Sequence, residues 1–69
     1  MREDLIALFA KIAQTATIAN YQHIGYKVLF DTVLTADDIN KINELCNKYT
    51  YRWMLSILND RFCLTIFNK

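Results

Sequence analysis

Few residues in this chain could do chemistry, and the first to consider are its only histidine, His23, and its two cysteines, Cys46 and Cys63. A cysteine beside a histidine can act as a nucleophile with its general base. However, His23 has no carboxylate or thiol next to it in the sequence, and Cys46 falls on the apolar stripe of a predicted helix, where a thiol is buried and unreactive. We therefore interpret His23 as a surface or turn residue and both cysteines as small hydrophobic residues.

Known catalytic and ligand-binding motifs are missing from the sequence. The single glycine excludes phosphate-binding glycine loops, and no H-E-x-x-H, C-x-x-C or G-x-S-x-G string occurs. We expect a protein without catalytic activity, cofactor or metal. A small-ligand pocket at a seam between two subunits is an alternative, because symmetry can build a cavity that one subunit lacks.

A third group of residues with recognisable chemistry is aromatic and basic: Tyr49, Tyr51, Arg52 and Trp53. Aromatic rings on strands with basic neighbours can stack on unpaired bases. We expect Tyr51 and Trp53 to pack in the core instead, which leaves Arg52, Arg61 and Phe67 for such contacts. Binding of single-stranded nucleic acid or of a nucleotide is therefore the alternative function.

The charge pattern favours neither duplex nucleic acid nor a membrane as partner. Eight Lys and Arg against seven Asp and Glu give a net charge of +1, and the charges are spread without runs. Lys11 interrupts the apolar N-terminal segment, which argues against a signal peptide or a membrane span. Two cysteines without metal-ligand spacing are typical of the reducing cytoplasm, and we expect a soluble cytoplasmic protein.

Hydrophobic periodicity predicts the elements that must position these side chains. We expect a helix over about 2–19, a strand over about 26–34, a helix over about 36–48, and a C-terminal hairpin of strands over about 49–58 and 61–67. Asn20 and Gly25 are expected to adopt left-handed conformations between the first helix and the first strand. Thr35 and Asp38 have the spacing of a capping box, so Asp37 and Asp38 are expected to stabilise a helix start rather than to catalyse.

The hairpin organises the rest of the predicted fold. A two-residue turn at Asn59 and Asp60 places three large apolar pairs on one face: Trp53 with Ile66, Leu55 with Leu64, and Ile57 with Phe62.

The chain is expected to form a single α+β domain, with two helices packed on one face of a three-stranded sheet. The third strand is predicted to lie between the first two, and a 1-2-3 order is the alternative.

The opposite face of the hairpin carries more apolar residues than a solvated face needs. The sequence is 54% hydrophobic and 22% charged, and 69 residues enclose only a thin core. The first helix could cover this face, two copies could join face to face or edge to edge, or another protein could bind there. We expect a homodimer, with this interface: Arg52, Met54, Leu58, Arg61, Cys63 and Phe67.

These features favour a small interaction protein, an inhibitor or adaptor that occupies the surface of a partner protein. Its size and composition are typical of small proteins encoded by phages and mobile elements, among them antagonists of host defence. That comparison rests on size and composition alone.

Overall fold

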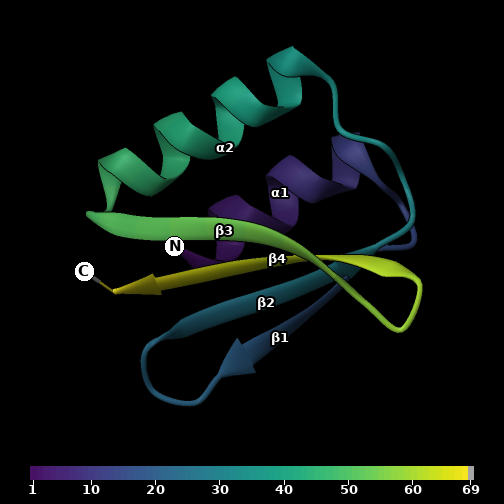
Figure 1. Ribbon diagram of the computed structural model, residues 1–69. Coiled ribbons are helices and arrows are strands. Elements are labelled where there is room, and N and C mark those ends of the chain that lie inside the picture. The colour runs from purple at the N-terminus through teal and green to yellow at the C-terminus, as the bar shows by residue number, and fades with distance from the viewer. Residues whose placement is uncertain (69) are drawn as a thin grey trace.

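The computed structural model describes residues 1–68, which form two helices and a four-stranded antiparallel sheet. Along the chain the elements are α1 (Arg2–Ile12), β1 (Thr17–Tyr21), β2 (Gly25–Phe30), α2 (Ala36–Lys48), β3 (Tyr51–Leu58) and β4 (Arg61–Asn68). Both helices lie on one side of the sheet (Figure 1). The protein therefore has the predicted α+β class.

The chain repeats one arrangement twice, a helix followed by a β-hairpin. The sheet order is β1-β2-β4-β3, so the second strands of the two hairpins meet in the centre. The first strands, β1 and β3, form the two edges. The architecture thus has approximate two-fold symmetry, although the sequence shows no repeat.

The predicted first helix, 2–19, is wrong in its second half, and the prediction of three strands is wrong with it. α1 ends at Ile12, and the residue that follows is extended. Thr17 and Ile18 are β-branched and fit a pleated strand better than a helix. Ile18 also lies opposite Val28, which gives the segment a strand partner.

The strand predicted over 26–34 is shorter than expected. β2 ends at Phe30, which lies opposite Phe62 near the start of β4. Beyond that point β4 offers only Arg61 as a partner, so the chain leaves the sheet and passes through residues 31–35 into α2.

The turn between β1 and β2 differs from the prediction. Gln22 adopts the left-handed conformation, with φ of 52°, whereas Asn20 and Gly25 do not. Gly25 is required for a different reason, because a Cβ atom at this position would lie 1.7 Å from the carbonyl oxygen of Ile66. The glycine therefore allows close approach of β2 to β4.

The C-terminal hairpin forms in the predicted register. Asn59 and Asp60 make its two-residue turn with φ of 52° and 63°. β4 lies between β2 and β3, so the predicted strand order is confirmed and the 1-2-3 alternative is wrong. The expected apolar pairs lie directly opposite one another: Trp53 with Ile66, Leu55 with Leu64, and Ile57 with Phe62.

The second helix begins and ends where the sequence predicts. The Thr35 hydroxyl accepts a hydrogen bond from the backbone N–H of Asp38 at 3.1 Å, and the Asp38 carboxylate accepts one from the N–H of Thr35 at 3.0 Å. Asp37 lies 3.1 Å from the Lys41 ammonium group one turn on. Both aspartates therefore have structural roles, as expected.

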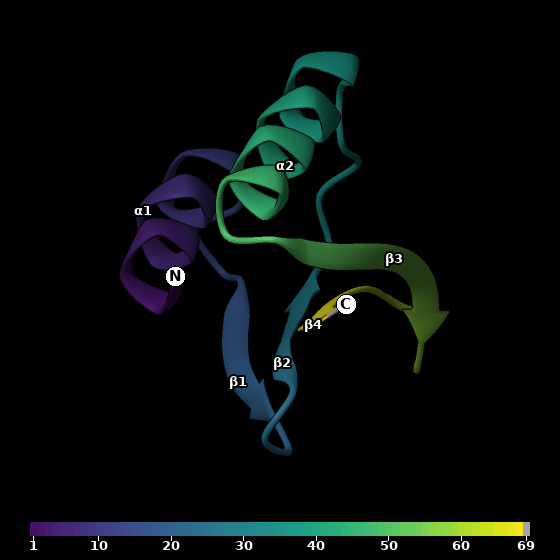
Figure 2. The same ribbon diagram turned by 90° about the vertical axis from the view of Figure 1, so that its left-hand side faces the viewer.

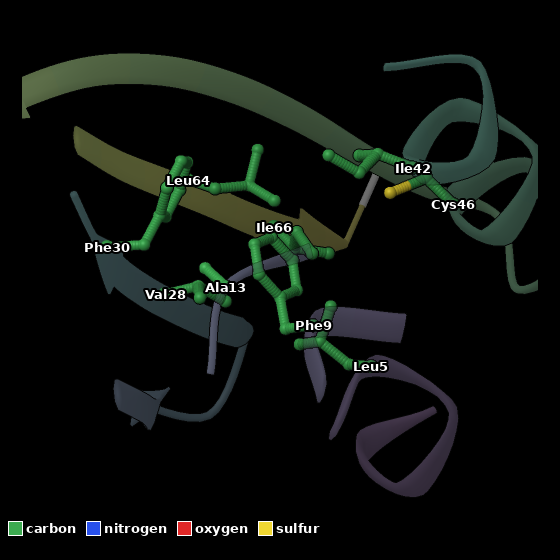
Figure 3. Packing of buried hydrophobic residues seen from close by; sticks show 9 residues of the cluster. All are labelled: Leu5, Phe9, Ala13, Val28, Phe30, Ile42, Cys46, Leu64 and Ile66. Carbon is green, nitrogen blue, oxygen red and sulfur yellow. The ribbon is translucent and has the colours of Figure 1, made fainter. Parts of the chain in front are cut away.

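The core lies between the helices and the helix-bearing face of the sheet (Figure 3). The Phe9 and Phe30 rings pack with their centroids 5.4 Å apart, and Phe62 stacks on Phe30 at 5.6 Å. The buried cluster draws on both helices and both central strands: Leu5, Phe9, Ala13, Val28, Phe30, Ile42, Cys46, Leu64 and Ile66.

Neither helix has the length and apolar character needed to cross a membrane; α1 and α2 contain 11 and 13 residues.

Candidate interaction surface

The side of the sheet that faces away from the helices is the candidate site, and we call it the open face. Strand register assigns its residues, because side chains directly opposite each other in antiparallel strands share a face. It comprises Thr17, Ala19 and Tyr21 of β1, Lys27 and Leu29 of β2, Arg52, Met54, Ser56 and Leu58 of β3, and Arg61, Cys63, Thr65 and Phe67 of β4.

All six residues of the predicted interface lie on the open face, but they differ in exposure. Met54 and Leu58 are 53% and 45% exposed, and Arg52 is exposed as well. Arg61 and Phe67 are half-buried, whereas Cys63 is only 3% exposed. Five of the six side chains can therefore contact a partner, whereas Cys63 is covered by its neighbours.

The open face is hollowed along its central strand. Cys63 and Thr65 of β4 are 3% and 8% exposed although both helices lie on the other side of the sheet. Figure 2 shows β3 bending through a wide arc, so the sheet is curved rather than flat. A pocket of about 190 Å³ lies here, lined by Tyr21, Ile24, Met54, Thr65 and Phe67.

Positive charge is concentrated on the open face. The four strands contain three charged residues, Lys27, Arg52 and Arg61, and all three are basic and lie on this face. The Lys27 ammonium group lies 4.5 Å from the centre of the Tyr21 ring, within cation–π range.

Arg61 is the one basic residue of this face with an ion-pair partner among residues 1–68. Its Nε lies 3.2 Å from the Asp31 carboxylate, and its Nη2 donates to the Leu29 carbonyl oxygen at 3.3 Å. These contacts hold the guanidinium against the end of β2, so Arg52 and Lys27 are better placed to meet a ligand.

Tyr21 and Lys27 are open-face residues outside the predicted interface, and Tyr21 adds an aromatic ring to this face. It lies in the same cross-strand row as Gly25, Phe67 and Arg52. In this row the Tyr21 and Phe67 residues lie on the two sides of Gly25, which has no side chain. The β-branched pair Thr17 and Ile18 is the available strand signal, but the predicted helix extends to residue 19 and Tyr21 falls in the predicted junction after it.

The aromatic residues near the start of β3 lie on the helix-bearing face. The Trp53 indole N–H donates to Asn43 of α2 at 3.2 Å, and Tyr51 meets Tyr26 edge to face at 6.5 Å. Both residues are half-buried against the core, as expected.

The candidate nucleophile and base are not brought together. Cys46 lies in the core, where burial raises the pKa of its thiol to about 11. His23 is exposed in the turn between β1 and β2, beside a shallow pocket of about 160 Å³. A protonated, buried thiol is a poor nucleophile. Within residues 1–68, no group of three or more His, Cys, Asp or Glu residues could hold a metal ion.

Comparison of the chain with protein-family models, with curated proteins and with solved structures found no significant match.

Proposed function

We propose that this chain is a non-catalytic protein-interaction module of the cytoplasm, which acts as an inhibitor or adaptor by covering a partner's surface with its open face, and which is itself a homodimer. The observation that carries the proposal is the exposure of Met54 and Leu58, at 53% and 45%, on a sheet face that faces away from both helices. Because each side chain is already about half covered, burying the rest of it would contribute roughly 1 kcal/mol before ordering costs. A role as an antagonist of host defence, encoded by a phage or mobile element, is part of the proposal.

The charges of the open face indicate the character of the partner surface. Lys27 and Arg52 flank the apolar residues Met54 and Phe67 in neighbouring cross-strand rows. Complementary charges favour productive encounters and suppress wrong partners. The partner surface should therefore be apolar at its centre and acidic at its rim.

Capture of interacting proteins with matched variants tests this proposal. Phe67→Lys places a charge on the open face, on a central strand near one end of the sheet. Ile6→Lys is the control, because Ile6 is 45% exposed on α1, on the other side of the sheet. We expect a partner that the wild type and Ile6→Lys both retain and that Phe67→Lys loses. Equal retention by all three folded proteins would contradict the role of the open face.

A second candidate function, binding of single-stranded nucleic acid or a nucleotide, is favoured by the row of Tyr21, Phe67 and Arg52. Two rings and a cation on one sheet face are the parts from which base-stacking surfaces are built. Lys27 adds a second cation beside Tyr21. The ion pair between Arg61 and Asp31 weakens this candidate, since it removes one of the two arginines predicted for the site.

A labelled oligonucleotide at low salt distinguishes the two candidates. Nucleic-acid binding predicts an affinity that falls steeply with salt, is lost in the double variant Arg52→Ala, Arg61→Ala, and is weakened in Tyr21→Ala. The interaction module predicts no salt-dependent shift for any of these proteins.

A further inference from the structure

The free side of β3 presents a row of main-chain groups without partners. The turn at Asn59 and Asp60 makes Leu58 and Arg61 the hydrogen-bonded pair that closes the hairpin, and such pairs alternate along antiparallel strands. The residues of β3 with even numbers therefore direct their N–H and C=O groups toward β4. The outward groups belong to Tyr51, Trp53, Leu55 and Ile57, and no backbone hydrogen bond joins them to other parts of residues 1–68.

One of these residues, Ile57, carries the most exposed apolar side chain of the strand. Ile57 is 73% exposed and Leu55 is 41% exposed on the helix-bearing face, beyond the part that the helices cover. Proteins usually protect an edge strand with lysine, proline, a bulge or short length. β3 has eight residues in continuous register, no lysine and no proline, and Arg52 is its only charge. The other edge strand, β1, has five residues.

We propose that this β3 edge pairs antiparallel with the same edge of a second copy of the chain, about a two-fold axis at Leu55. This inference rests on the homodimer of the proposed function and names its seam. The outward groups restrict the register, because only residues with odd numbers can form hydrogen-bonded pairs across the seam. Among the registers that remain, an axis at Leu55 brings the exposed Leu55 and Ile57 side chains of both copies into one strip. Leu55 then lies opposite Leu55 of the partner subunit, and Trp53 lies opposite Ile57 of the partner subunit. The result is a continuous eight-stranded sheet with four helices on one face.

Charge and symmetry favour a second copy as the occupant. The pairing places Arg52 opposite Leu58 of the partner subunit, so the two arginines lie about 20 Å apart along the seam. That separation exceeds the screening length of about 8 Å at physiological salt. The exposed apolar side chains of both copies meet in one strip, and no charge is buried. An isologous contact of this kind closes at two copies.

The seam is small for a protein interface. Standard interfaces involve about 20–30 residues on each side, whereas β3 contributes eight. We therefore expect association in the micromolar range rather than the nanomolar range. Experiments should cover about 1 μM to 1 mM.

Sedimentation analysis of three variants tests the seam. Ile57→Pro removes an outward N–H and leaves every hydrogen bond between β3 and β4 in place. Ile57→Lys leaves the backbone unchanged and places a charge on the edge. Phe67→Lys is the matched control, because Phe67 lies on β4 and on the open face. We expect both Ile57 variants to be monomers across the range, and Phe67→Lys to dimerise like the wild type.

Amide hydrogen exchange in the wild type provides a readout that does not depend on the folding of any variant. We expect the N–H groups of Trp53, Leu55 and Ile57 to gain at least tenfold protection between the low and the high concentration. Those of Met54 and Ser56 face β4 and should be protected at both concentrations.

Each contrary outcome has a separate meaning. A dimer that Phe67→Lys dissociates and the Ile57 variants do not would overturn the edge seam and leave an open-face homodimer. A wild type that is monomeric at 1 mM, without protection of the outward amides, would overturn the seam and the homodimer. The proposal that the open face binds another protein would then be tested by the capture experiment alone.

Discussion

At the scale of single residues, Tyr49 and Asp4 form a side-chain contact that joins the end of α2 to the start of α1. The Tyr49 hydroxyl donates a hydrogen bond to the Asp4 carboxylate. This bond lowers the pKa of Asp4 below 3.8 and raises the pKa of Tyr49 above 10.0. The contact therefore stabilises the fold most where the carboxylate is charged and the phenol is neutral.

Tyr49→Phe should raise the pKa of Asp4 toward its ordinary value, because the donor is lost. A group with a depressed folded pKa stabilises the protein above its unfolded pKa and loses that contribution as the pH falls through the folded value. The difference in unfolding free energy between wild type and variant should accordingly shrink as the pH drops below 3.8. Carboxyl titration by NMR and denaturation at several pH values measure both effects. Tyr21→Phe is the control, and a pKa of Asp4 that is the same in wild type and Tyr49→Phe would contradict the contact.

Gly25→Ala should destabilise the protein, because the added methyl group would lie 1.7 Å from the Ile66 carbonyl oxygen. The methyl group would force β2 and β4 apart, which should lower the free energy of unfolding by about 1–3 kcal/mol. Urea denaturation measures the loss. Ala19→Val, which adds methyl groups to an exposed position of β1, should change stability by about 0.5 kcal/mol or less. Equal stability of Gly25→Ala and wild type would show that the two strands are not in close contact here.

At the scale of elements, the start of α2 depends on its capping box. Thr35→Ala removes the acceptor for the N–H of Asp38 and should cost about 1 kcal/mol. Asp37→Ala removes an exposed ion pair with Lys41 and should cost less, about 0.3–0.5 kcal/mol for the pair. Thermal or urea denaturation ranks the two variants. A larger loss in Asp37→Ala would mean that charge, rather than the cap, stabilises this helix end.

The elements that the sequence predicted well are those whose signals are local. The hairpin register follows from alternating large apolar residues on both sides of Asn59 and Asp60, and α2 follows from its cap. β1 was missed because the turn after it has Gln22, rather than glycine or asparagine, in the left-handed conformation. The sequence places the expected turn residues at Asn20 and Gly25 instead, which extends the predicted helix to residue 19 in spite of the β-branched Thr17 and Ile18.

The candidate site could be predicted only in part for the same reason. Alternation along β3 and β4 placed six residues on one face, and the register confirms that placement. Tyr21 was missed together with its strand. Cys63 is buried between its cross-strand neighbours Leu29 and Ser56, and the pairing of β2 with β4 that provides one of them is not a local feature of the sequence.

At the scale of the whole molecule, two helix-hairpin units share one sheet and bury one of its faces. The helices cover the apolar pairs of the central strands, but the outer part of β3 and the open face extend beyond them. Small domains gain little stability from their cores, so an uncovered apolar surface is a large fraction of what they could bury. The proposed association would bury part of this surface.

The measurement that addresses this account most directly is the mass of the wild-type chain in solution, determined by sedimentation equilibrium from micromolar to millimolar concentration. We predict a reversible rise from 8.1 kDa to twice that value as the concentration increases. A mass of 8.1 kDa at every concentration would mean that one copy tolerates its uncovered sheet in water, and the account of a self-associating module would be wrong.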